Sequence, residues 1–297
     1  MANLKTLKTR IKSVRSTQKM TKAMKMVAAS RLKKAKHLVE SSRPFADKIQ
    51  EMIVSLASNV AVRDKLNEKF PLLTGTGKDK TYLIVVFSSD RGLCGGLNSS
   101  TVKVVKARVN ALIAQDKEVK LLCIGKKAYD QLKSAYSGKI IDHISGIFRS
   151  SIDYKIAQDL SQKIITLFEQ DEFDICEVIY SKFKSAIAQE QVLKQLIPAQ
   201  IKATNQEPVA ASESPIFYEP NEEAVLSDLL PKNLSMQIYN ELLENSASEQ
   251  GARMAAMEAA SNNAGKMIKN LTLVYNRTRQ ANITKELIDI ISGANVV

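Results

Sequence analysis

The sequence has little of what several protein classes require. No window approaches the roughly 18 consecutive apolar residues of a membrane span, so we expect any membrane association to go through a partner. The three cysteines, Cys94, Cys123 and Cys176, are odd in number and far apart, and the only histidines are His37 and His143. This pattern predicts neither a disulfide framework nor a zinc site. It favours a protein that resides in a reducing cytoplasm.

Proline and glycine are scarce near both ends of the chain, where apolar or small residues recur at steps of three and four. Such spacing is typical of a coiled-coil seam. The first seam consists of Leu4, Leu7, Ile11, Val14, Gln18, Thr21, Lys25, Ala28, Leu32, Ala35, Val39, Ser42, Ala46, Ile49, Ile53 and Leu56. The last, whose steps are three, four or a full heptad of seven, consists of Met236, Leu243, Ala247, Met254, Met257, Ala264, Ile268, Leu271 and Tyr275. We therefore expect the two ends to pair as one antiparallel coiled coil.

Two prolines bear on where these helices begin and end. The first seam keeps its register across Pro44, which therefore predicts a kink and not an end. Pro231 suits the first turn of the last helix, where its missing N–H is an orphan anyway. The first twenty residues are basic and free of acids, as in a transit peptide, but the seam runs straight on to Leu56, which argues against cleavage.

Between the helices, β-branched runs alternate with amphipathic stretches, which predicts a largely parallel α/β sheet. Expected strands are 82–88, 119–125, 143–148, 175–183 and 191–201, the last bulged at Pro198, and expected helices are 99–115, 126–136 and 154–170. Residues 70–80 indicate a linker and 205–215 a flexible excursion. The predicted fold is a long antiparallel coiled coil plus a central Rossmann-like α/β domain with a mostly parallel sheet. Its parts are 1–57 (N-terminal helix), 78–202 (central domain), 203–220 (excursion) and 221–297 (C-terminal helix, with 221–230 as a short lead-in).

Acidic residues are nearly absent from the first fifty positions, which hold 14 Lys and Arg against Glu40 and Asp47. The whole chain has 43 basic and 31 acidic residues, so the remainder holds 29 of each. This excess implies an acidic partner, nucleic acid being the usual candidate, with a merely solvated basic face as the alternative. Aromatic side chains that could stack on bases are missing there, apart from Phe45.

The Gly-rich loop Ser89–Asn98 (SDRGLCGGLN) follows a predicted strand and invites a phosphate-binding interpretation. The spacing of its glycines fits neither a dinucleotide fingerprint nor a P-loop. The favoured role of the loop is that of a tight turn with Asp90 and Asn98 as caps. For the chain as a whole, an independent α/β enzyme stays a rival hypothesis. Cys94 lies between Leu93 and Gly95, which predicts a thiol that reagents can reach.

Three motifs carry a resemblance along essentially the full chain: Thr21–Ser30 (TKAMKMVAAS), the Ser89–Asn98 loop, and Tyr275–Ala294 (YNRTRQANITKELIDIISGA). In this order they resemble the γ subunit family of F-type ATP synthases. The resemblance implies a non-catalytic rotor shaft that stands in a ring of α and β subunits, with an ε-type subunit and the membrane c-ring at its foot. It further implies catalysis on β, no cofactor, metal or nucleic acid, and a peripheral place on the cytoplasmic face of the bacterial inner membrane.

The resemblance also implies roles for residues of the last helix. Arg279 and Gln280 would make polar contacts with β loops, and Thr284 and Glu286 would support them. Beyond the polar break the sequence is apolar enough to enter a sleeve in another protein, a bearing tip made of Ile283, Leu287, Ile290, Ile291 and Ala294.

On the opposite helix, the resemblance implies that Met24 and Lys25 face β. Cys94 would lie near an acidic lever of β, which is the acidic partner that the charge count predicts. The main hypothesis is therefore a rotor subunit, and a nucleic-acid-binding coiled-coil protein is its rival.

Overall fold

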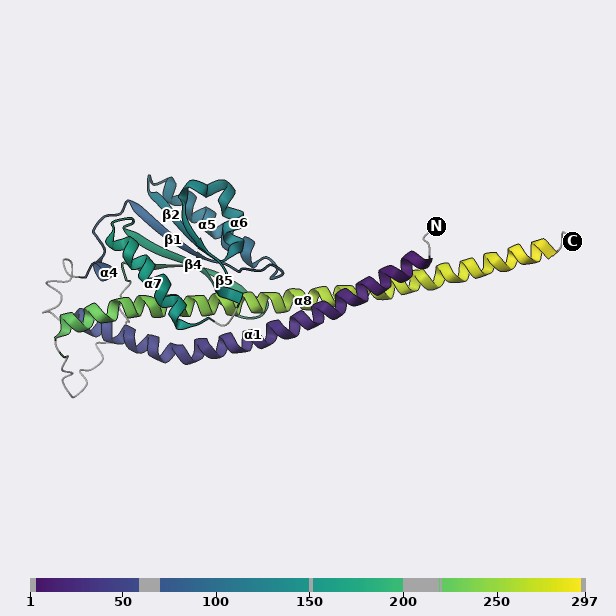
Figure 1. Cartoon of the computed structure of the whole chain (residues 1–297), viewed down its shortest axis with the longest axis horizontal. Helices are drawn as coiled ribbons and strands as arrows, with labels where there is room; N and C mark the ends of the chain where they lie inside the picture. The colour runs from purple at the N-terminus through teal and green to yellow at the C-terminus, as the bar shows by residue number, and fades with distance from the viewer. Residues whose placement is uncertain (1–3, 59–69, 150–151, 200–218, 220, 295–297) are drawn as a thin grey trace. The chain divides into compact units, whose positions relative to one another are not determined.

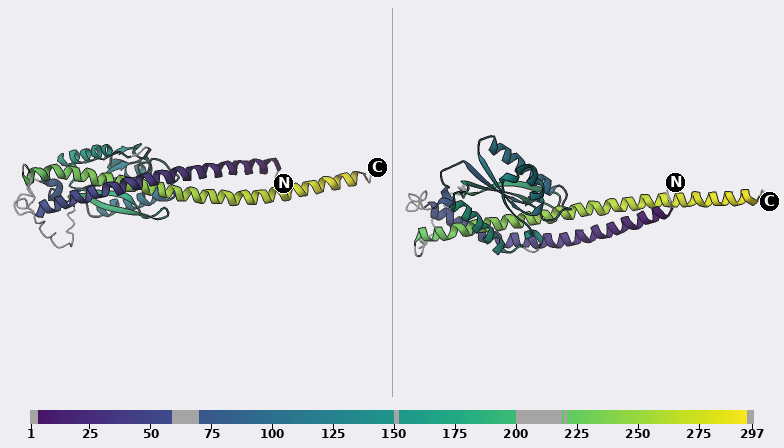
Figure 2. Two further views of the ribbon diagram at one scale, coloured as in Figure 1. Left: turned by 90° about the horizontal axis from the view of Figure 1, so that it is seen from below. Right: turned by 45° about the horizontal axis from the view of Figure 1, so that its top comes forward.

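A computed structural model describes residues 4–58, 70–149, 152–199, 219 and 221–294. The chain divides into two compact units, residues 1–30 with 253–297 and residues 31–252, and each is described by itself. Two long helices, α1 (Leu4–Ser58) and α8 (Glu222–Ala294), run through both units (Figure 1). Within each unit α1 and α8 lie side by side (Figures 1 and 2).

The predicted seam is confirmed along α1, because every seam position is buried or half-buried while most positions between them are exposed. The pairing is antiparallel. In the first unit the Gln18 side chain donates to the Ser261 carbonyl at 3.3 Å. In the second, the Ser42 hydroxyl lies 2.7 Å from Oδ1 of Asn240. The small residue Ala28 is 1% exposed, which indicates close approach of the two helices there.

The second unit holds a five-stranded sheet in the order β3-β2-β1-β4-β5, and the predicted mostly parallel sheet is confirmed. Four strands are parallel, namely β1 (Thr81–Phe87), β2 (Glu118–Ile124), β3 (Ile140–Ile144) and β4 (Ile175–Phe183). The edge strand β5 (Gln189–Ile197) runs antiparallel to β4.

Helices cover both faces of this sheet, which explains why its central strands are apolar throughout. Along β1, Leu83, Val85 and Phe87 face a core that includes α7 (Tyr154–Glu169) and residues of α8. Alternate β1 residues face a second core under α5 (Leu97–Ile113) and α6 (Lys126–Tyr136) (Figure 1). The sheet is thereby held against α8.

Two elements in the middle of the chain differ from the sequence prediction. The third strand spans Ile140–Ile144 and not 143–148, so it begins and ends earlier than expected; it cannot continue because Gly146 has a positive φ of 95° and the 3₁₀ turn η2 (Ile147–Arg149) follows. The expected linker contains a short helix, α4 (Pro71–Thr74). Its Leu73 is buried in a cluster with the end of α1 and the start of α8, which gives the segment an apolar reason to fold.

The last strand also differs, because β5 ends at Ile197 and its irregularity skips Leu196, so the bulge lies before Pro198. A short 3₁₀ turn, η1 (Ser137–Lys139), connects α6 to β3. Residues 200–201 and the expected excursion 203–220, except residue 219, lie outside the described residues.

The last helix begins earlier than Pro231. It starts at Glu222, where Asn221 Oδ1 accepts the backbone N–H of Ala224 at 2.8 Å as an N-cap. Leu226 and Leu230 are buried in the same cluster as α4, so packing extends the helix through the proline. Pro44 likewise lies inside α1, as predicted, and does not end it. None of the described helices is long and apolar enough to cross a membrane.

Candidate interaction surfaces

The Gly-rich turn after β1 is fixed by the carboxylate of Asp90, which is 8% exposed. Its Oδ1 accepts the backbone N–H groups of Lys126 at 3.3 Å and Gly146 at 2.9 Å, and its Oδ2 accepts that of Phe148 at 3.1 Å. Lys126 is the first residue of α6, so the carboxylate occupies the anion-binding end of that helix. A carboxylate of the chain itself therefore occupies the N-terminus of α6.

The other predicted cap, Asn98, closes the turn from its far side. Asn98 Oδ1 accepts the backbone N–H of Ser89 at 3.1 Å, and its Nδ2 lies 3.1 Å from Sγ of Cys94. The predicted capping role is confirmed for Asp90, which accepts from the first N–H of α6, whereas Asn98 lies inside α5 and holds the start of the turn instead of capping a helix. The turn is a structural element whose polar groups point at one another.

The prediction that reagents can reach the Cys94 thiol is wrong. Cys94 is 1% exposed and packs with Leu97 and Ala252, the latter from α8. Because its neighbour Leu93 adopts a positive φ of 65°, that side chain is turned outward and is 62% exposed. Leu93, which the sequence analysis did not single out, is an apolar residue that this turn exposes on its surface.

Met24 and Lys25, expected on a partner-facing surface, both lie half-buried on α1 in the first unit. Lys25 Nζ contacts Oε1 of Glu258 on α8 at 2.6 Å, an internal partner that the sequence analysis missed. The pair borders an open cavity of about 530 Å³, whose lining includes Gln18, Lys19, Lys22, Met26 and Asn262. The neighbouring Met20 and Val27 side chains are 57% and 56% exposed, so this stretch of α1 presents apolar and basic groups together.

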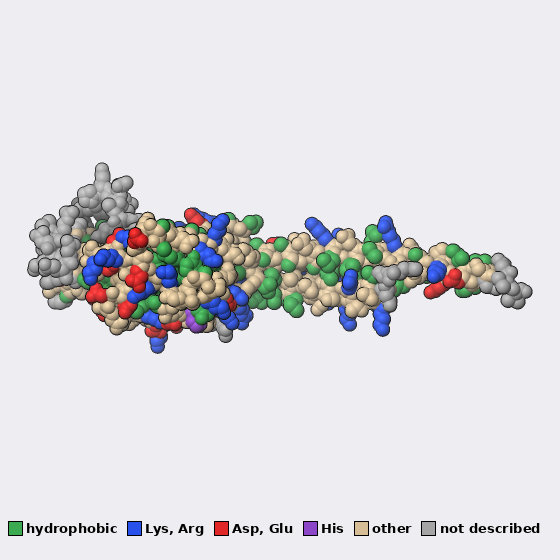
Figure 3. All heavy atoms as spheres, turned by 90° about the horizontal axis from the view of Figure 1, so that it is seen from above, with side chains coloured by type: hydrophobic (Ala, Val, Ile, Leu, Met, Phe, Trp, Pro, Cys, Tyr) green, Lys and Arg blue, Asp and Glu red, His purple; other side chains and the backbone are tan. Residues whose placement is uncertain are grey.

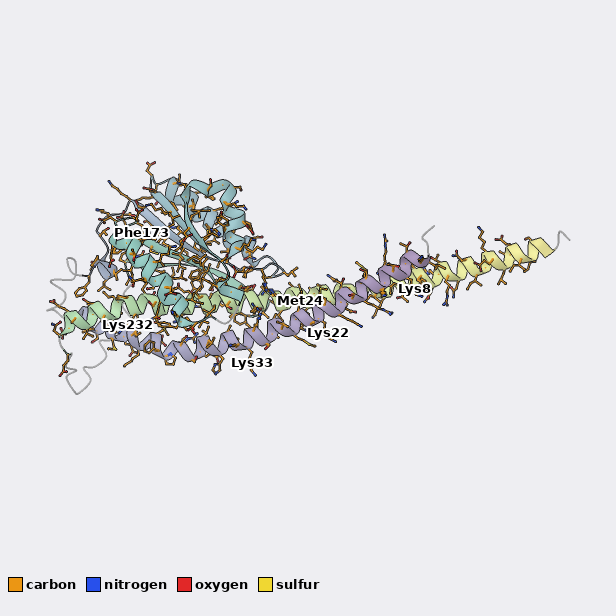
Figure 4. The ribbon with its side chains drawn as sticks, in the orientation of Figure 1. Lys8, Lys22, Met24, Lys33, Phe173 and Lys232 are labelled. Atoms are coloured by element: carbon orange, nitrogen blue, oxygen red, sulfur yellow. The ribbon has the colours of Figure 1, made fainter. Side chains whose placement is uncertain are left out.

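The positive charge of the chain is concentrated in the first unit, which holds 14 Lys and Arg against 3 Asp and Glu. Among the described residues, Lys8, Arg10 and Lys22 have no acidic partner. Lys8 and Lys22 project from α1 in Figure 4, and basic side chains stand out along the paired helices in Figure 3. An uncompensated field of this size attracts acidic surfaces over a distance of about one Debye length.

The end of α8 is an amphipathic helix with an uncovered apolar side. The exposed fractions of Ile283, Leu287, Ile290 and Ile291 are 48%, 54%, 67% and 61%. Spaced by three, four and seven residues, these side chains share one stripe, and Ala294 continues it in sequence. We call these five residues the apolar tip.

Just before and along the apolar tip, the polar residues expected to contact a partner are all exposed. Arg279 and Glu286 are seven residues apart and share one side of α8, whereas Gln280 and Thr284 are four apart and share another. The structure therefore places the four on the surface of one helix. Gln280 and Thr284 each lie seven residues before a residue of the apolar stripe and continue it, and Arg279 and Glu286 lie beside it.

Comparison with known proteins agrees with this architecture along the full chain. A sequence model of the ATP synthase family matches residues 3–297. The ATP synthase gamma chain of Rhodospirillum rubrum is 48% identical over 302 residues, and that of Pelagibacter ubique is 48% identical over 294 residues. These alignments cover 100% and 99% of both chains, respectively.

Solved structures give the same picture. A chain of the Tetrahymena thermophila mitochondrial ATP synthase, from a structure of the central stalk and c-ring, is 31% identical with a TM-score of 0.62. That match covers 82% of this chain and 99% of the other. A chain of the Euglena gracilis enzyme, 17% identical with a TM-score of 0.66 and covering 99% of this chain and 94% of that one, supports the fold alone.

An antiparallel pair of terminal helices, together with a mostly parallel sheet covered by helices on both faces, defines the class of coiled-coil proteins with a central α/β domain. The full-length matches make the assignment specific. The chain belongs to the ATP synthase γ chain family.

Proposed function

We propose that this chain is the central rotor shaft of an F-type ATP synthase, which couples proton flow through the membrane sector to ATP synthesis and hydrolysis in the catalytic α/β ring. The full-length similarity to ATP synthase gamma chains carries this assignment. The chain itself is not an enzyme, because the γ chain is the non-catalytic central-stalk subunit and catalysis is in the β subunits.

Torque would pass to β at two places on the paired helices. On α8, exposed Arg279 and Gln280 contact β loops, with Thr284 and Glu286 beside them. On α1, Met24 and Lys25 form the opposite contact, and the basic side chains around them favour an acidic partner surface. Lys25 already pairs with Glu258. It can therefore exchange Glu258 for a carboxylate of β without passing through a state in which its charge has no partner.

The Gly-rich turn provides a third contact, close to the acidic lever of β. Cys94 itself is buried, so it supports this contact from below, and the exposed side chain of Leu93 meets the partner. The hydrogen-bonded turn holds this side chain in a fixed position, but a single apolar side chain adds little affinity. Such a contact suits an interface that must break in each cycle.

The apolar tip would turn in a sleeve at the top of the α/β ring. Exposed Ile and Leu side chains along one stripe of a helix favour burial against a partner. An apolar lining lacks directional hydrogen bonds, so the helix can rotate inside it without breaking any. This is the property that a bearing needs.

At the other end, the α/β domain would dock with an ε-type subunit on the c-ring, at the cytoplasmic face of the bacterial inner membrane. The absence of any membrane-crossing helix among the described residues is compatible with a peripheral position in the complex.

The test compares two arginines of α8 that are both exposed and lie only two residues apart, Arg279 and Arg277. Arg279→Ala removes one partner of a charge-assisted contact, a loss that costs about 2–5 kcal/mol at an interface. We expect ATP synthesis in membranes with this variant to fall sharply while the complex still assembles. Arg277→Ala, which removes the same charge from another side of the helix, should leave synthesis near wild type.

Wild-type synthesis rates with Arg279→Ala would refute the assigned contact. Co-purification addresses the rival hypothesis, since a rotor subunit travels with α and β whereas a nucleic-acid-binding protein does not.

A further inference from the structure

Strand β4 extends beyond its neighbour β1 at the end that leads to the β4–β5 hairpin. Pairing between the two strands stops at Val86 and Ile179, so the β4 backbone from residue 180 to 183 has no strand on that side. Backbone groups left open in this way must find other hydrogen-bond partners when they are buried.

Side chains of α8 take the place of the missing strand. Asn245 Oδ1 accepts the backbone N–H of Ser181 at 3.3 Å, and Ser248 Oγ donates to the carbonyl of Ser181 at 2.8 Å. Two residues further along β4, the backbone N–H of Phe183 donates to Oε2 of Glu244 at 3.0 Å. The helix thus continues the hydrogen-bond ladder of β4 with its own side chains.

The same side of α8 holds the neighbouring strand and the hairpin. Glu241, 3% exposed by its side chain, pairs with Lys194 of β5 at 2.9 Å. Gly251 lies against the ring of Phe183 so closely that a Cβ there would lie 2.7 Å from Cε2. Glu241, Glu244, Asn245, Ser248 and Gly251 follow one another at steps of one or three residues along one stripe, which we call the α8 clamp.

Stability alone is a poor reason for this stripe to be polar. Burying carboxylate and amide groups carries a desolvation cost that apolar side chains of similar size avoid. Hydrogen bonds to a strand backbone depend on direction, whereas apolar packing does not. They therefore resist rotation of the helix about its axis and sliding of the helix along it. The α8 clamp also lies just before Ala252, the last residue of the second unit.

We propose that the α8 clamp is the positioning device through which the α/β domain and α8 turn as one body, so that torque passes between them without slip. This inference rests on the proposed rotor function. In the proposed complex the c-ring holds the α/β domain and the α/β ring holds α8. The torque between the domain and α8 is then borne by contacts that resist rotation of α8. The clamp supplies these contacts on β4 and β5.

The experiment uses the complete ATP synthase in membrane vesicles. Glu244→Ala and the double variant Glu244→Ala/Asn245→Ala remove clamp bonds, and Glu244→Gln keeps the acceptor oxygen that Phe183 uses. Two controls remove side chains of α8 whose hydrogen bonds, within the part of the chain that the structure describes, go to elements other than β4. Ser235 donates to the carbonyl of Pro231 in its own helix, and Asn240 contacts Ser42 of α1.

Two readouts are measured for each variant. Hydrogen exchange of a peptide covering β4 reports whether the Ser181 and Phe183 amides lose protection, and ATP-driven proton pumping per ATP hydrolysed reports coupling. We expect both alanine variants to raise exchange in β4 and to lower the pumping ratio, by about half or more for the double variant, while ATPase activity persists. Glu244→Gln, Ser235→Ala and Asn240→Ala should keep the wild-type ratio.

Faster exchange with an unchanged pumping ratio would overturn the proposal, because the stripe would then be structural only. Unchanged exchange would overturn it too, since the bonds would not hold β4. Glu244 is only half-buried, so Glu244→Ala is expected to assemble even if the double variant does not. Arg279→Ala in the same assay separates the two hypotheses: if it uncouples while the clamp variants do not, the rotor function stands and only the clamp fails.

Discussion

Replacing Asp90 by alanine should destabilise the α/β domain more than any surface change, because one carboxylate serves three backbone donors. The N–H groups of Lys126, Gly146 and Phe148 all bond to it, and these residues belong to three different segments of the chain. A buried donor left without an acceptor costs about 1–3 kcal/mol. The 3.3 Å bond to Lys126 is the longest and contributes least.

The loss is the sum of two strong bonds and one weak one, reduced because water can reach a site that is 8% exposed. We therefore expect Asp90→Ala to lower the free energy of unfolding by about 3–5 kcal/mol. Asp90→Asn keeps one acceptor oxygen and should cost about 1–2 kcal/mol. Asp159, an exposed residue of α7, provides the matched control, since its alanine variant should stay within about 0.5 kcal/mol of wild type.

Urea unfolding of the full chain, followed by circular dichroism, measures these differences through the transition midpoint at constant slope. The cavity left by Asp90→Ala exposes the N-terminus of α6, so formate or acetate should partly restore stability to this variant and not to wild type. A loss below about 1 kcal/mol for Asp90→Ala, or equal effects of the anion on both proteins, would refute the assignment of Asp90 as the internal anion of the turn.

Two further predictions follow from burial and close contact. Cys94, Cys123 and Cys176 are all buried, and burial raises the pKa of the Cys123 thiol to about 12, so the folded chain should react slowly with maleimide. Leu93→Cys should react at least about tenfold faster, and equal rates would show that the turn is not oriented as described. Glycine to alanine normally stabilises a helix interior by about 1 kcal/mol, yet Gly251→Ala should destabilise the chain in urea, because its Cβ would lie 2.7 Å from Phe183. Gly265→Ala is the control: its Cβ would meet only Nε2 of Gln18, the far end of a long side chain, at 3.1 Å, and a small shift of that end relieves the contact, so this variant should cost much less than Gly251→Ala.

The features that the sequence predicted well are those that repeat along the chain. The seam of α1 follows a fixed spacing, so each half-buried position, even polar Gln18, could be assigned to the helix pair without knowing its partner. The buried strands were equally plain, because a sheet covered on both faces leaves a continuous apolar run such as Tyr82–Phe87.

The errors concern residues whose environment is set by distant parts of the chain. Cys94 is covered by Ala252, more than 150 positions away, and no local pattern signals that contact. The early end of β3 reflects Gly146 and its bond to Asp90. The early start of α8 has a local signal in Asn221 as N-cap, but a proline at position 231 locally favours a helix that starts there. The packing of Leu226 and Leu230 against the end of α1, which extends the helix, has no signal in the local sequence.

The chain places its two kinds of contact in different units, and the physical difference between them matches the proposed function. Inside the second unit, where 29 basic residues face 28 acidic ones, the α8 clamp uses short directional bonds that hold one register. The first unit, with 14 basic and 3 acidic residues, offers charge and exposed apolar side chains instead. Charge attraction varies smoothly with position, and apolar contact has no preferred direction, so such contacts can form with one partner and be released again at less cost than a set of directional hydrogen bonds. A rotor that must hold its own domain in one register and still release each partner in turn needs this division.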